Sequence, residues 1–162
     1  MAGKRVSLRP PRTPTLYLDE CLPPAVGEAL ALVGHAIIVP EDAGKRGAKD
    51  PDLIPSMAQE ALVWVTKGDD AKRSHHRQIR QHQLSVVWVR GLDRSKSFIS
   101  VRQLHLMLTV KLPEIVAQVA AANGARYFEL GLKSGQYEGH PVLNRVDQER
   151  MQPGARLREI GI

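Results

Sequence analysis

The sequence predicts an α/β domain in which helices flank a parallel sheet of four to five strands. Short apolar runs alternate with segments of helical periodicity between residues 15 and 91. The links between them are short, and repeated strand–helix–strand units of this kind form parallel sheets with right-handed crossovers. Carboxylates also follow the apolar runs, where open α/β sheets place their ligands. We therefore expect a three-layer α/β/α domain with an acidic site at one edge of its sheet.

The first strand and the first helix are predicted around a run of carboxylates and prolines. A strand is expected at Thr15–Leu18, where an apolar run ends in Asp19 and Glu20. A helix is expected at roughly Pro24–Val33, because proline suits a first helical turn. The next apolar run, Ala36–Val39, is typical of a fully buried strand of a parallel sheet.

The middle of the chain repeats this alternation. Asp50 and Pro51 predict a helix start, since a carboxylate suits the N-cap and a proline suits the position after it. A third strand is expected at Leu62–Thr66, and a fourth at Val86–Val89. The segment Lys72–Gln83 between them predicts a basic helix.

The remaining elements complete the domain. Residues Ser100–Ala122 predict a long helix, which Pro113 is expected to kink or split. Tyr127–Leu132 predicts an edge strand. We expect a basic disordered N-terminal segment over residues 1–14, one domain over residues 15–132 and a loosely packed C-terminal tail over residues 133–162.

Composition narrows the class of protein. The chain has 162 residues, of which 43% are apolar, so one domain with a real core is expected. No apolar run approaches the roughly 18 residues of a membrane span, and no apolar secretory segment is found near the start. The single cysteine, Cys21, agrees with a reducing cytoplasm, where we expect the protein to act without a membrane. A net charge of +6 points to nucleic acid or another polyanion.

Three pairs of acids follow successive strands: Asp19/Glu20, Asp50/Asp52 and Asp69/Asp70. In a right-handed parallel sheet these positions share one edge, and clustered carboxylates require a proton or a cation. Oxygen ligands suit Mg²⁺ or Mn²⁺, and no spacing of cysteine and histidine here suits structural zinc. The alternative is helix capping, which by itself would explain Asp50 and would also suit Asp69 or Asp70.

Basic residues follow the third pair of acids. Residues 71–90 contain no acid, and the side chains that we expect to contact RNA phosphate come from this segment: Lys72, Arg73, His76, Arg77 and Arg80. His75 and His76 point about 100° apart on a helix, so they do not chelate one ion and are expected to be exposed. Trp64 and Trp88 are expected in the core, and Cys21 is expected to be a small buried side chain beside the acids.

The order of these motifs resembles the PIN-like nuclease superfamily, in particular the VapC-type toxins of bacterial toxin–antitoxin pairs. The matching pieces are Leu16–Pro23, Val33–Pro40, Gly47–Ile54 and Leu62–Asp70, and with V-V-W-V-R-G they cover roughly residues 15–91. The resemblance implies a PIN-like α/β/α fold with an acidic pocket for Mg²⁺ or Mn²⁺. It assigns metal-ligand and catalytic roles to Asp19, Asp50, Asp69 and Asp70, with Glu20 and Asp52 assisting.

The function that the resemblance implies is that of a metal-dependent endoribonuclease, the toxin of such a pair. A cation in the pocket would activate water for attack on an RNA phosphodiester. The expected partners are RNA, a cognate antitoxin protein and, as a candidate only, a second copy of the chain in a homodimer. The alternative is a catalytically inactive PIN-like module that binds RNA or protein. Gly68 gives that alternative weight, because relatives often have a further aspartate at this position.

Overall fold

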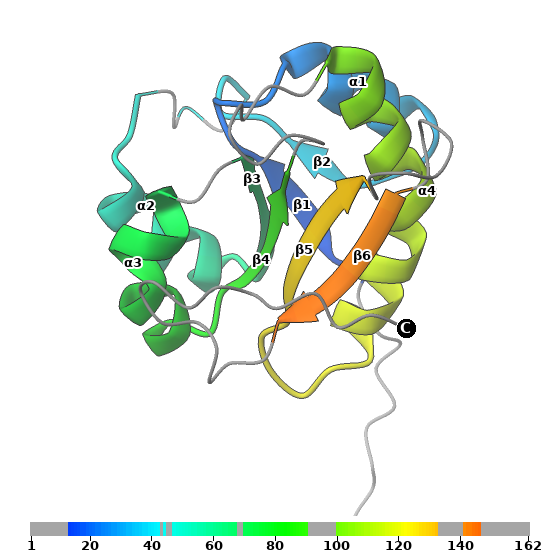
Figure 1. Ribbon diagram of the computed structural model, residues 1–162. Coiled ribbons are helices and arrows are strands. Elements are labelled where there is room, and N and C mark those ends of the chain that lie inside the picture. Colours follow the sequence, from blue (N-terminus) through cyan, green and yellow to red (C-terminus); the bar gives the residue numbers. More distant parts are fainter. Residues whose placement is uncertain are drawn as a thin grey trace, which may run out of the picture.

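The computed structural model contains one six-stranded sheet between two layers of helices (Figure 1). It describes residues 13–42, 44, 47–67, 70–90, 100–132 and 141–146. The order of the strands is β2-β1-β3-β4-β5-β6. The first five run parallel to one another and β6 pairs antiparallel with β5. The predicted α/β class, with a parallel sheet of up to five strands, is therefore confirmed.

Most of the predicted elements lie where the periodicity placed them. The strands are β1 (Thr15–Leu18), β2 (Ile37–Ile38), β3 (Leu62–Lys67), β4 (Ser85–Val89), β5 (Tyr127–Leu132) and β6 (Pro141–Val146). The helices are α1 (Pro24–Leu32), α2 (Asp50–Gln59), α3 (Asp70–Gln81) and α4 (Val101–Ala120). A capping box between Ser100 and Gln103 starts α4, because each side chain accepts a hydrogen bond from the other residue's backbone.

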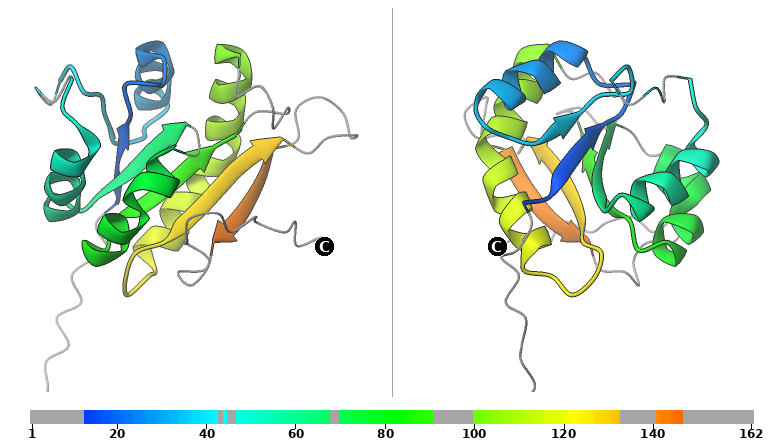
Figure 2. Two further views of the ribbon diagram at one scale, coloured as in Figure 1. Left: turned by 60° about the vertical axis from the view of Figure 1, so that its left-hand side comes forward. Right: turned by 180° about the vertical axis from the view of Figure 1, so that it is seen from behind.

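Two apolar layers hold the helices against the sheet. Alternate residues of the central strands point to opposite faces, so each face has its own buried cluster. The helices α1 and α4 cover one face, where Leu16 and Val65 are buried among their side chains. The helices α2 and α3 cover the other face (Figure 2). Trp64 and Trp88 are buried there, at 0% and 2% exposure. The core placement of both tryptophans is thus confirmed.

Four expectations about elements are wrong, each for a structural reason. The strand expected to be fully buried at Ala36–Val39 has two half-buried residues, because β2 lies at the edge of the sheet. The strand β5 is not an edge strand, since residues 141–146, expected in a loose tail, form β6 beside it. The helix α4 is continuous through the exposed Pro113, so the split that was one form of the expectation does not occur. The fourth concerns the start of α2, described with the site below.

The strand order has a topological switch point between β1 and β3. The chain leaves β1 through α1 to β2 on one side and returns through α2 to β3 on the other side of β1. Neighbouring connections therefore lie on opposite faces at this point, which is the topological switch point of the sheet. Open α/β sheets bind ligands outside the carboxyl ends of the strands at such a point. Asp19 follows β1 directly, so the fold places it at this switch point.

No helix in the described part of the chain has both the length and the apolar character required to span a bilayer.

Candidate functional site

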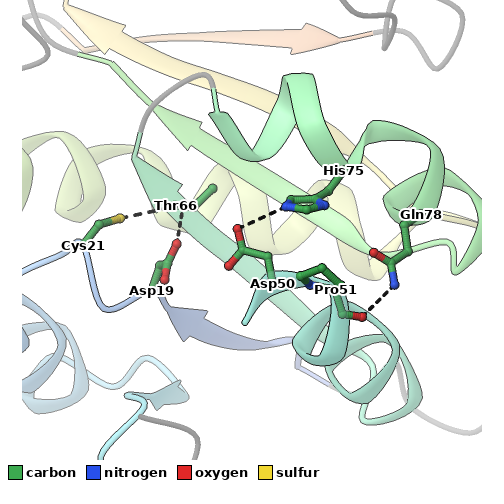
Figure 3. Close-up of polar contacts among 7 residues, drawn as sticks. All are labelled: Asp19, Cys21, Asp50, Pro51, Thr66, His75 and Gln78. Atoms are coloured by element: carbon green, nitrogen blue, oxygen red, sulfur yellow. Dashed lines mark hydrogen bonds and ion pairs between the residues drawn. The ribbon is translucent and has the colours of Figure 1, made fainter. Parts of the chain in front are cut away.

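The side chain of Asp19 is held in place at the carboxyl end of β1. The backbone N–H of Asp19 donates to the carbonyl oxygen of Val65 at 2.9 Å, which continues the pairing of β1 with β3. Its carboxylate accepts two hydrogen bonds, one from the Glu20 backbone N–H at 2.7 Å and one from the Thr66 hydroxyl at 2.5 Å. The half-buried carboxylate is therefore fixed in orientation, and Figure 3 shows it directed toward Thr66.

Thr66 is a site residue that the sequence reasoning missed. It is 2% exposed near the end of β3, and it is one of the few buried polar residues among those described. Its hydroxyl joins Asp19 to the end of the neighbouring strand. The available signal was its place as the one hydroxyl residue in the apolar run L-V-W-V-T-K, next to the carboxyl end of a central strand.

Asp50 is the first residue of α2, whereas we expected it to be the N-cap residue just before the helix. The N-cap is Lys49, and no side chain caps this helix. The capping interpretation of Asp50 is therefore wrong, because the helix begins one residue before the position that the Asp-Pro pattern indicated. Instead, Oδ2 of Asp50 lies 3.7 Å from Nε2 of His75 on α3. A second contact, from the Gln78 side chain to the Pro51 carbonyl oxygen at 2.7 Å, also joins α3 to this end of α2.

The carboxylates of Asp19 and Asp50 interact electrostatically. Burial raises the pKa of Asp50 above its ordinary value, and the negative charge of Asp19 raises it further, while His75 acts in the opposite direction. Asp19 and Asp50, separated by 31 positions in the sequence, therefore lie near enough for the charge of one to act on the other. In the described part of the chain, no lysine or arginine pairs with either carboxylate.

The acidic character of this edge extends to buried groups beside it. Burial raises the pKa of Tyr17 in β1 to about 12, and the charges of Asp19 and Glu20 contribute to the shift. Negative charge disfavours the further ionisation of a nearby phenol. Tyr17 is therefore a neutral phenol beside these acids.

Cys21 lies beside this site, as expected, but the residue is exposed rather than buried. Its sulfur accepts a hydrogen bond from the Lys67 backbone N–H at 3.3 Å and lies 3.8 Å from the Thr66 hydroxyl. Local burial of the thiol is the largest cause that raises the pKa of Cys21, and the charge of Asp19 adds to it. A thiol with a raised pKa is mostly protonated, so it is poorly suited to act as a nucleophile.

The other expected ligands are distributed differently. The Glu20 carboxylate is exposed and accepts a hydrogen bond from the Gly47 backbone N–H. Asp52 is exposed in the first turn of α2, and no described contact joins its side chain to Asp19 or Asp50. Asp69 lies outside the described residues, as does the side chain of Asp70, the first residue of α3. Among the residues that are described, no group of three or more histidine, cysteine, aspartate or glutamate side chains could hold a metal.

The residues expected to contact RNA differ in their exposure. Arg77 and Arg80 are exposed on α3, whereas the side chains of Lys72 and Arg73 lie outside the described residues. His76 is only 8% exposed, so the expectation of an exposed histidine is wrong there. It lies three residues from the buried Ile79, on the helix face that packs toward the sheet. His75 is the histidine beside the acids, which periodicity alone did not indicate.

The oxygen donors present fit a hard divalent cation. Mg²⁺ in proteins is commonly held by one or two carboxylates, with waters and substrate phosphates completing its shell. Asp19 and Asp50 supply two carboxylates, and their mutual repulsion would be relieved by a bound positive charge. The donor set of this edge therefore suits Mg²⁺ or Mn²⁺ better than a soft metal.

Comparison with known families bears on the same stretch of chain. Residues 14–91 match the family model described as a PIN like domain. The match runs from β1 to the end of β4, so it contains Asp19, Asp50 and Thr66. It supports the PIN-like superfamily that the sequence resembles, and the α/β/α fold agrees with it. No curated protein and no solved structure matches the chain.

Proposed function

We propose that the protein is a metal-dependent ribonuclease that cleaves RNA phosphodiester bonds and acts as the toxin of a toxin–antitoxin pair. The observation that carries the proposal is the position of the Asp19 carboxylate, held by Thr66 at the switch point of the sheet, with Asp50 near enough to be affected by its charge. PIN-like domains are commonly nucleases, and the match to such a domain covers both residues. The assignment as a toxin depends on the resemblance to VapC-type chains, and a cognate antitoxin is the partner that it requires.

The chain's own residues prepare the site in three ways. Thr66 and the Glu20 N–H orient the Asp19 carboxylate, and Asp50 is carried by the first turn of α2, where it contacts His75. The two carboxylates would hold Mg²⁺ or Mn²⁺, with Asp69 and Asp70 as further proposed ligands. When bound there, a divalent cation supplies an activated water and stabilises negative charge on a phosphodiester.

Substrate binding is assigned to the exposed face of α3. Arg77 and Arg80 are exposed on this helix, which also places His75 beside Asp50. Guanidinium groups bind phosphate oxygens through paired hydrogen bonds. An RNA backbone that passes the acidic edge would thus find positive charge next to it, and Lys72 and Arg73 of the same helix would add to that charge.

The test is the cleavage of total RNA by the purified protein with Mg²⁺ or Mn²⁺, with and without EDTA. We expect cleavage that EDTA abolishes, and a loss of at least about a hundredfold in Asp19→Asn, which removes one charge and keeps the shape. Glu114→Gln is the matched control, because this exposed carboxylate lies on α4, on the face of the sheet opposite α2 and α3. Full activity of Asp19→Asn in Mg²⁺ would refute the mechanism.

A second candidate function is a PIN-like module that binds RNA or protein without cleaving it. It is favoured by the described residues, which bring together two carboxylates rather than three, and by Gly68. Titration with Mn²⁺ separates the two candidates. A nuclease would show saturable binding that Asp50→Asn weakens, whereas an inactive module would show no saturable site at this edge.

A further inference from the structure

One side chain joins the two segments that carry the paired carboxylates. Glu20 lies in the turn after β1, next to Asp19, and its Oε1 accepts a hydrogen bond from the backbone N–H of Gly47. Gly47 lies three residues before Asp50. The contact therefore connects the immediate neighbour of one candidate ligand to the backbone that leads into the other.

The position of Gly47 is suited to such a contact. Its φ is +74°, in the left-handed region that glycine adopts without steric cost. An added Cβ would meet no atom within 4 Å there, so the backbone conformation rather than crowding favours glycine at this point. A turned backbone of this kind presents its N–H to an acceptor outside its own segment, and in this structure that acceptor is the Glu20 carboxylate.

No other polar contact in the described part of the chain joins the turn after β1 to the segment that enters α2. The start of α2 is otherwise held from α3, through His75 on Asp50 and through Gln78 on Pro51. Those contacts fix the position of the start of α2 relative to α3, but they do not fix its position relative to β1. The separation between Asp19 and Asp50 thus depends on the Glu20–Gly47 hydrogen bond in addition to the packing of α2 on the sheet.

The carboxylates of Asp19 and Asp50 repel one another, so a hydrogen bond between the segments that carry them would keep them from separating. Repulsion between like charges favours separation of Asp19 from Asp50 while no cation lies between them. A hydrogen bond between the Gly47 N–H and a side-chain oxygen of residue 20 opposes that separation. From these contacts we propose that Glu20 is a positioning residue, which holds the backbone before Asp50 close to Asp19 so that both carboxylates are in place for a cation.

This inference rests on the proposed function and assigns to Glu20 a role different from that of a metal ligand. A metal ligand at residue 20 would bind the cation through its negative charge. A positioning residue there needs only an oxygen that accepts the hydrogen bond of the Gly47 N–H. Glutamine removes the charge and keeps an acceptor oxygen, and alanine removes both. The two substitutions therefore give different outcomes under the two roles.

The experiment compares the unsubstituted full chain with Glu20→Gln and Glu20→Ala. Binding of Mn²⁺ is measured by calorimetry, and hydrogen exchange of the Gly47 amide is measured in the metal-free protein. We expect Glu20→Gln to bind Mn²⁺ within about threefold of the unsubstituted chain and to keep the Gly47 amide protected. We expect Glu20→Ala to weaken Mn²⁺ binding by about tenfold, the scale of one hydrogen bond, and to speed exchange at Gly47.

Two results would overturn the positioning role. Equal weakening of Mn²⁺ binding by Glu20→Gln and Glu20→Ala, with Gly47 exchange unchanged, would identify Glu20 as a ligand instead. Unchanged binding and unchanged exchange in Glu20→Ala would leave Glu20 with no role. The failure of the proposed function is distinguishable from both, since the unsubstituted chain would then bind no Mn²⁺ while the Gly47 amide still responded to Glu20→Ala.

Discussion

The substitution Thr66→Val tests how the fold orients Asp19. The Thr66 hydroxyl donates to Oδ2 of Asp19 at 2.5 Å, and the threonine is 2% exposed. Valine has a similar shape, so it opens no large cavity, but it removes the donor and places a methyl group against a carboxylate. We expect a less stable protein with a less firmly held Asp19.

The magnitude follows from the burial of the two partners. A hydrogen bond to a charged group contributes about 1.5–3 kcal/mol, and the loss is largest where water cannot replace it. Thr66 is fully buried but Asp19 is only half-buried, so water can reach the carboxylate from one side. We therefore expect the lower end, a loss of about 1.5 kcal/mol in the free energy of unfolding.

The assay is urea unfolding of the four proteins of a double-mutant cycle: the unsubstituted chain, Thr66→Val, Asp19→Ala and the double variant. A coupling of at least about 1 kcal/mol between the two positions is expected for residues in direct contact. The same cycle with Thr66→Ser is the control: serine keeps the hydroxyl, so Asp19→Ala should cost the same in either background and this cycle should give a coupling near zero. A coupling within about 0.3 kcal/mol of zero for Thr66→Val would show that this hydroxyl does not hold Asp19.

Two further predictions concern the charge of Asp50 and the packing of α1. Because the folded pKa of Asp50 is raised, its ionised form destabilises the fold, and stability should rise as the pH falls through that pKa toward the ordinary 3.8. Asp50→Asn should therefore unfold at higher urea than the unsubstituted chain near neutral pH, and a less stable variant would contradict the assignment. Gly27→Ala should cost about 1 kcal/mol, because its Cβ would lie 3.0 Å from Cγ1 of Val39, and overpacking of about 1–3 kcal/mol exceeds the gain in helix propensity. The exposed Glu28→Ala on the same helix should change the urea midpoint little, and equal effects of the two would refute the close packing.

The opposite effects expected of Asp50→Asn on stability and on activity are typical of a functional site. Natural proteins retain destabilising charges where a function needs them, and removal of such a charge stabilises the fold at the expense of activity. A rise in stability together with a loss of RNA cleavage would therefore support a role for Asp50 in the site. Capping of α2 would have the reverse effect, since loss of a cap lowers stability.

Local patterns in the sequence were sufficient for most of the fold. The apolar runs that became β1, β3 and β4 were recognisable because a buried strand needs consecutive apolar residues, and the prolines marked the start of α1. The order of strand and helix then fixed the parallel sheet and its right-handed crossovers. The same order placed Asp19 at the carboxyl end of β1, since the residue that follows a parallel strand lies at that edge of the sheet.

Only the tertiary structure decided the contacts between segments far apart in the chain. The hydrogen bond from Thr66 to Asp19 spans 47 positions, and the one from Gly47 to Glu20 spans 27. Periodicity reports which face of an element is apolar, but it does not report which polar groups meet across two elements. For that reason β6 beside β5, His75 beside Asp50 and the burial of His76 emerged only when the elements were packed together.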